Sequence, residues 1–195
     1  MAVYDTSVAL ACIRGNEEAC KLMSEDPECM IPPTATSEIW SFKHKLPSNC
    51  KLLTYDDPPF DDPSVATEPA AFVYAVEKVF MSPPKRGRRR EWEVSERTKN
   101  YFRRFCVGIK NGKIDENDWR IVKEANVLAE LDYIEDKRLI SNDKHITNDF
   151  CRLAYEHVMS YLDEITGSEP EKMEVEIVPF REAIHHKEPQ KQVIP

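Results

Sequence analysis

The sequence predicts a mainly α-helical protein built around a small helical domain. Apolar side chains recur every three or four residues over 119–131 and over 150–165, which is the spacing of one helix face. Glycine is scarce, with 5 residues in 195 against about 7% in average proteins, which argues against sheet-and-turn folds and glycine-rich nucleotide loops. The 14 prolines cluster between the apolar segments and therefore mark connectors.

Residues 1–26 are expected to form an N-terminal helical hairpin. Two short helices flank Gly15, with Thr6 and Asn16 as their N-caps. The stretch resembles the hairpin of an ankyrin repeat, in register at Thr6, Leu10, Ala11, Gly15, Glu18, Lys21 and Leu22. It departs at Ser7, where the repeat has proline, and no second copy follows. The resemblance therefore implies a local helix-turn-helix, since such repeats need about three copies for stability.

Residues 27–67 lack regular patterning and are expected to form an extended connector rich in proline and aspartate. A connector of this length usually has a function or drapes over a surface. Its apolar anchors are expected to be Trp40, Phe42, Leu52, Leu53 and Tyr55.

The helical core domain is predicted over 68–167. Helices are expected over 69–80, near 95–106, from about residue 115 and over 147–165, where Thr147 is the N-cap and Gly167 ends the helix. Residues 168–195 are expected to hold a short strand, because 173–180 alternate between polar and apolar, followed by a polar tail.

Residues 95–130 resemble a degenerate EF-hand, with Gly112, Ile114, Asp115 and Asp118 at matching loop positions. The resemblance implies a calcium-free loop, because Val107 and Ile109 stand where carboxylates are required. A similar arrangement recurs at 141–150, "SNDKHITNDF", and the alternative is a plain turn in each place.

No metal site or cofactor is predicted. One set of residues has the side chains for a tetrahedral zinc ion, namely Cys12, Cys20, Cys29, His44 and Cys50. Its cysteines are separated from one another by seven residues or more, unlike the tight knuckles of structural zinc sites. No catalytic signature occurs either, so the chain is not expected to be an enzyme.

The charge layout is the sharpest functional signal. Residues 82–104 carry nine basic groups and three glutamates, a net charge of +6, so the rest of the −8 chain carries −14. The predicted site for a partner or nucleic acid comprises Lys85, Arg86, Arg88, Arg89, Arg90, Trp92, Arg97, Lys99, Arg103 and Arg104. This basic patch also has the composition of a nuclear localisation signal. The alternatives are a solvated surface, the chain's own acidic segments, an acidic protein or nucleic acid.

These observations predict a non-catalytic structural or adaptor protein that acts as a subunit of a larger assembly, with other protein subunits as partners. The alternative is a nucleic-acid-associated protein of a viral matrix or regulatory type. No apolar window is long enough for a membrane span, no secretory signal is evident, and the 6 cysteines are expected to be reduced. An intracellular location, cytoplasmic or nuclear, is therefore expected.

Overall fold

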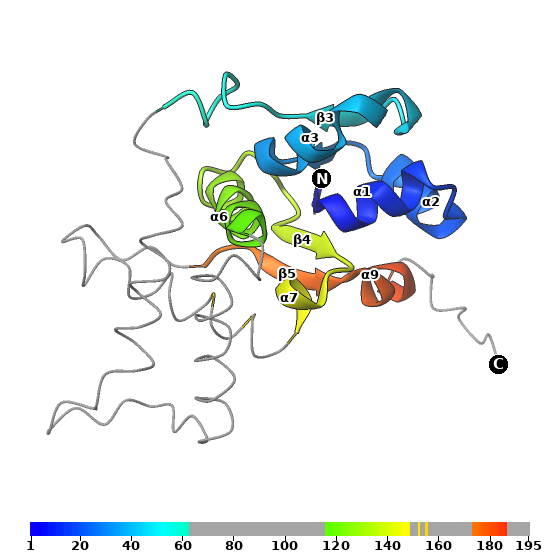
Figure 1. The fold of residues 1–195 in the computed structure, drawn as a ribbon. Coiled ribbons are helices and arrows are strands. Elements are labelled where there is room, and N and C mark those ends of the chain that lie inside the picture. The colour runs from blue at the N-terminus through cyan, green and yellow to red at the C-terminus, as the bar shows by residue number, and fades with distance from the viewer. Residues whose placement is uncertain (63–115, 149–151, 153–154, 156–172, 187–195) are drawn as a thin grey trace, which may run out of the picture.

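A five-stranded parallel sheet organises the described part of the chain (Figure 1). The computed structural model describes residues 1–62, 116–148, 152, 155 and 173–186. The strand order is β3-β2-β1-β4-β5. The strands are β1 (Val3–Tyr4), β2 (Cys29–Ile31), β3 (Cys50–Leu52), β4 (Arg138–Ser141) and β5 (Glu176–Pro179). Residues from 1–26, 116–148 and 173–186 thus share one sheet, although the sequence analysis placed them in separate segments.

The prediction of a mainly α-helical fold, with a small helical domain, is wrong: the described residues have an α/β arrangement. The strands could not be predicted from the sequence pattern because they are short and two of them are buried throughout. All residues of β1 and β2 are buried, so neither strand alternates between polar and apolar side chains. A buried run of two or three residues carries no periodicity by which a strand is distinguished from part of a helix.

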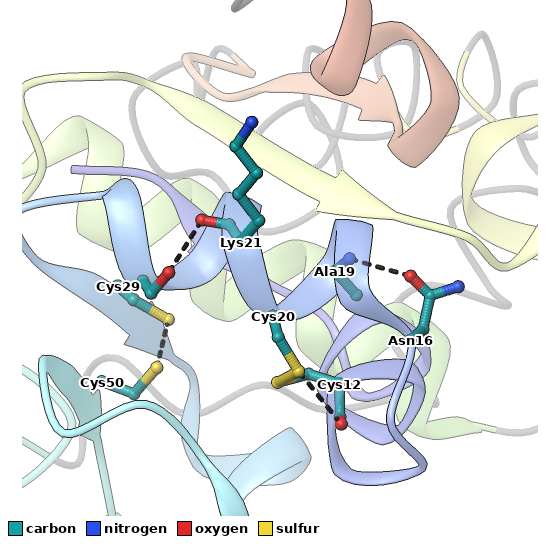
Figure 2. Close-up of a disulfide and its surroundings, with 8 residues drawn as sticks. Cys12, Asn16, Ala19, Cys20, Lys21, Cys29 and Cys50 are labelled. Carbon is teal, nitrogen blue, oxygen red and sulfur yellow. Dashed lines mark hydrogen bonds between the residues drawn. A yellow bond between two sulfur atoms is a disulfide. The ribbon is translucent and has the colours of Figure 1, made fainter.

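Two helices, α1 (Thr6–Ile13) and α2 (Glu17–Glu25), form the N-terminal hairpin. The predicted cap Asn16 is confirmed, since its side chain accepts a 2.9 Å hydrogen bond from the amide of Ala19. The cap of α1 is Asp5, one residue before the predicted Thr6. Gly15 adopts φ of +89°, which permits the tight turn between the helices. A disulfide between Cys12 and Cys20 joins the two helices (Figure 2), where reduced cysteines were expected.

The segment 27–67, expected to be an extended connector, contains regular elements up to residue 62. Strand β2 leads into α3 (Pro33–Ile39), then the 3₁₀ helix η1 (Trp40–Lys45) and strand β3. Pro33 opens α3, where a missing amide proton costs no helical hydrogen bond. Leu53 is a buried anchor as expected, but Trp40 and Phe42 are 48% and 45% exposed.

The described remainder contains α6 (Glu116–Glu130), α7 (Lys144–Thr147) and α9 (Phe180–His186). The predicted stripe on α6 is confirmed at four positions, since Trp119, Val122, Ala125 and Leu128 are buried. Leu131 is 50% exposed, because α6 ends before it. Strand β5 lies inside the segment 173–180, whose alternation predicts a strand.

Several predictions fall outside the described residues. These are the helices over 69–80 and 95–106, most of the helix over 147–165, the loop glycine and first ligand positions of the EF-hand resemblance, and the whole basic patch. Among the helices of the described residues, none combines the length and apolar character needed to cross a bilayer.

Candidate functional site

Acidic residues gather where two neighbouring parallel strands end. Asp5 directly follows β1, and Asp143 lies two residues after β4. The two strands pair in parallel, with Tyr4 opposite Ile140. The sheet order reverses here, because the chain runs outward from β1 through β2 to β3 and returns on the other side of β1 with β4. In open α/β sheets, ligands bind in the crevice outside the carboxyl ends of the strands at this switch point.

Asp118, Asp143 and His145 form the centre of the site, with one ligand atom from each lying within 4.8 Å of the others. His145 Nδ1 lies 3.7 Å from Asp118 Oδ2 and 3.5 Å from Asp143 Oδ1. Asp118 comes from the first turn of α6, while Asp143 is the N-cap of α7 and accepts a 2.7 Å bond from the amide of His145. All three side chains are partly exposed, Asp118 at 15%, Asp143 at 37% and His145 at 38%.

Asp5 is connected to this cluster through Ser141. Its carboxylate is 2% exposed and accepts hydrogen bonds from the Ser7 amide at 2.8 Å, the Ser7 hydroxyl at 2.7 Å and the Ser141 hydroxyl. Ser141 Oγ in turn accepts from the amide of Asp143 at 2.9 Å. Burial raises the pKa of Asp5, the serine hydrogen bonds oppose that rise, and the negative charge of Asp143 adds to it. The end of β1 is thereby coupled to the loop that carries Asp143.

Glu38 adds a further carboxylate from the last turn of α3. This exposed side chain accepts a 2.7 Å hydrogen bond from Asn117 Nδ2 and another from the Thr6 hydroxyl. Thr6 follows Asp5, and Asn117 precedes Asp118, so both bonds connect Glu38 to neighbours of the acidic site. We refer to Asp5, Glu38, Asp118, Asp143 and His145 as the acidic site.

Four of the five residues of the acidic site carry carboxyl groups. Within the described ranges, no lysine or arginine forms an ion pair with Asp5, Glu38 or Asp143. Like charges held this close disfavour one another, and a bound divalent cation would relieve that repulsion. The two carboxylates suit Mg²⁺ or Mn²⁺, and the imidazole nitrogen suits Zn²⁺ and other transition metals. The residues therefore fit a divalent cation.

A buried carboxylate fixes the helices that carry the acidic site. Glu124 of α6 is fully buried and accepts bonds from the Thr34 amide at 3.0 Å, the Thr34 hydroxyl at 2.6 Å and the Tyr55 hydroxyl at 2.6 Å. Burial raises the pKa of Glu124, and its bonds to Thr34 and Tyr55 act in the opposite direction. Since Thr34 lies in the first turn of α3 and Glu38 in its last turn, this contact holds Glu38 against the start of α6.

The zinc candidates are not gathered into one ligand set. Cys12 is bonded to Cys20, while Cys29 and Cys50 form a separate pair with 2.8 Å between their sulfur atoms (Figure 2). His44 is exposed on η1. Of the described residues, the one group that could hold a metal ion is Asp118, Asp143 and His145.

From the sequence we assigned no ligand role to the residues of the acidic site, although three of them lie in segments that we singled out. Asp118 drew attention in the EF-hand resemblance, and Asp143 and His145 lie in the similar segment 141–150. The missed signal was an aspartate at the end of two short apolar runs, "AVYD" and "RLISND". Once those runs are taken as parallel strands, their aspartates must meet at one edge.

No family model matches the chain, and neither a curated protein nor a solved structure matches it.

Proposed function

We propose that this chain is a divalent-cation-dependent phosphodiesterase that acts on nucleic acid. The observation that carries the proposal is the meeting of Asp118, Asp143 and His145 at the switch point of the sheet. Magnesium is commonly held by one or two carboxylates together with the phosphates of the substrate, which is the ligand pattern this cluster leaves open.

The exposure of the cluster favours a polymer over a small metabolite. Asp143 and His145 side chains are 37% and 38% exposed, and Glu38 is exposed as well. Side chains exposed to this extent can meet a phosphate in the middle of a long chain. A nucleic-acid substrate also agrees with the alternative function predicted from the basic patch, whose residues lie outside the described ranges.

Each residue of the acidic site has a distinct role in this proposal. Asp118, Asp143 and His145 hold the cation, and Glu38 is the exposed carboxylate that meets the substrate side of the site. Asp5 is a positioning residue, because its oxygens are already occupied by Ser7 and Ser141. A bound divalent cation supplies Lewis acidity for the phosphate and lowers the pKa of a water molecule.

Cleavage of an end-labelled single-stranded RNA and a DNA of the same sequence tests the proposal, with Mg²⁺ or Mn²⁺ added and with EDTA as the blank. We expect cation-dependent cleavage by the wild type that Asp118→Asn and Asp143→Asn each reduce by about 10- to 100-fold or more, since each removes the negative charge of a ligand. Asp132→Asn is the matched control, because Asp132 is exposed beyond α6 and its φ of 54° suits asparagine. Cleavage by the two variants at the wild-type rate would overturn the assignment.

The expected role as a non-catalytic subunit stays a prediction, and the same assay bears on it. Absence of hydrolysis with every cation and both strands would favour that role over the phosphodiesterase.

A further inference from the structure

Two exposed aromatic side chains lie immediately beyond Glu38. Trp40 and Phe42 of η1 are 48% and 45% exposed, whereas the third described aromatic of comparable exposure in this region, Tyr55, is anchored by its hydroxyl to Thr34 and Glu124. Trp40 is two residues after Glu38, so their Cα atoms are no more than about 7.6 Å apart. The aromatic pair therefore borders the acidic site.

A lysine ammonium group lies over one face of each ring. Lys43 Nζ lies 3.6 Å from the ring centre of Trp40, and Lys45 Nζ lies 5.8 Å from that of Phe42. Both lysines are exposed, and within the described ranges neither forms an ion pair with a carboxylate. We refer to residues 40–45, "WSFKHK", as the aromatic-basic strip.

The strip has the two features that bind single-stranded nucleic acid without regard to sequence. Aromatic faces stack on unpaired bases, and neighbouring cations follow the phosphates. A duplex keeps its bases stacked inside and offers none to these rings. An acidic peptide could use the lysines, but it has no flat bases for Trp40 and Phe42.

We propose that the aromatic-basic strip is a stacking surface that holds a single-stranded nucleic acid and leads its backbone toward Glu38 and the acidic site. Trp40 and Phe42 stack on bases of one face of the strand, while Lys43 and Lys45 contact the phosphates between them. The direction of the strand toward the acidic site rests on the proposed function. Binding at the strip itself does not depend on catalysis.

Binding of labelled single strands to the full chain tests this proposal in EDTA, where no cleavage occurs. The probes are RNA and DNA oligonucleotides of about twelve nucleotides, within the range that single-strand-binding modules cover, and a duplex of the same length. For whichever single strand the wild type binds, we expect the Trp40→Ala/Phe42→Ala variant to lose at least about tenfold in affinity. Tyr133→Ala is the matched control, because Tyr133 is also an exposed aromatic, at 39%, but lies in the loop after α6.

A second variant keeps the test decisive if the aromatic variant folds poorly. Lys43→Ala/Lys45→Ala changes exposed side chains alone, and we expect it to make the salt dependence of single-strand binding shallower by about 0.7 per lost phosphate contact. The proposal is overturned if the wild type binds neither single strand, if both strip variants bind as tightly as the wild type, or if the duplex or a polyglutamate peptide competes as well as the single strand.

Failure of binding at the strip can be distinguished from failure of the proposed hydrolysis. Asp143→Asn should bind the single strand in EDTA at least as tightly as the wild type, since it removes a negative charge. Trp40-dependent binding without hydrolysis supports the strip and contradicts the phosphodiesterase. Hydrolysis with an unchanged KM in the strip variants would support the phosphodiesterase and contradict the strip.

Discussion

Thr34 and Glu124 are 90 residues apart in the chain and are joined by two hydrogen bonds, from the Thr34 amide at 3.0 Å and from its hydroxyl at 2.6 Å. The pair lies in the interior, with Thr34 5% and Glu124 0% exposed. It fixes the start of α3 on the middle of α6 and so sets the relative position of Glu38 and Asp118. Because Glu124 is a titratable group, this contact makes the packing of α3 against α6 dependent on pH.

Replacement of Glu124 by glutamine should flatten that dependence. Burial holds the pKa of Glu124 above its usual value, so the folded state retains a proton that the unfolded state releases. The free energy of unfolding should therefore fall as pH rises above about 4.3, the ordinary value for glutamate, and Glu124→Gln should remove that part of the fall. Urea unfolding midpoints from acid to neutral pH measure this fall in the free energy of unfolding. Glu130→Gln, an exposed site on the same helix, is the control, and an equal slope in Glu124→Gln and the wild type would contradict the assignment.

Ser141 connects the buried Asp5 to the Asp143 loop, since its hydroxyl donates to the first and accepts from the amide of the second. Ser141→Ala should lower the free energy of unfolding by about 1–3 kcal/mol, because it leaves buried partners unsatisfied. Ser24→Ala, at an exposed site, should change it by less than about 0.5 kcal/mol. Chemical denaturation of the two variants provides the comparison, and equal losses would show that the Ser141 contacts contribute no stability of their own.

Divalent cations should stabilise the fold through the acidic site. At a cation concentration 100 times the Kd, the gain is about 2.7 kcal/mol, which corresponds to a rise of about 5–10 °C in Tm for a chain of this size. Thermal melts with and without Mn²⁺ should show the rise in the wild type and in Asp132→Asn, but not in Asp118→Asn or Asp143→Asn. An equal rise in all four proteins would place the bound cation elsewhere.

Alanine substitutions of Leu128 and Leu131 test which face of α6 is buried and where that face ends. Leu128 is fully buried and Leu131 is 50% exposed. Leu128→Ala should therefore cost about 2–5 kcal/mol, as core truncations do. Leu131→Ala should cost less than about 0.5 kcal/mol, as exposed substitutions do. Similar costs in urea melts would contradict the observed end of the stripe.

Local and periodic features could be predicted from the sequence, whereas those set by strand pairing could not. Asn16 was identified as a cap because its partner is three residues away, and Trp119, Val122, Ala125 and Leu128 because a helix of 15 residues repeats its pattern. The acidic site depends on β1 lying beside β4, although Asp5 and Asp143 are 138 residues apart in the sequence. No pattern along the chain encodes that pairing.

The aromatic side chains of the aromatic-basic strip were noticed in the sequence, but they were expected to be buried. Trp40 and Phe42 were expected to anchor a connector, because large aromatics usually bury their surface. Their exposure follows from the turn of η1, which directs the residues of this segment to the surface. Neighbouring lysines in the sequence were compatible with either arrangement.

The central claim, that the acidic site holds a divalent cation, is tested most directly by crystals of the protein soaked in Mn²⁺ and measured for anomalous scattering. We expect one peak at coordination distance, about 2.0–2.2 Å, from Asp118 Oδ2, Asp143 Oδ1 and His145 Nδ1. The peak should vanish in crystals of Asp143→Asn. A wild-type map with no peak among these three atoms, at a Mn²⁺ concentration that raises Tm, would show that the cation binds elsewhere.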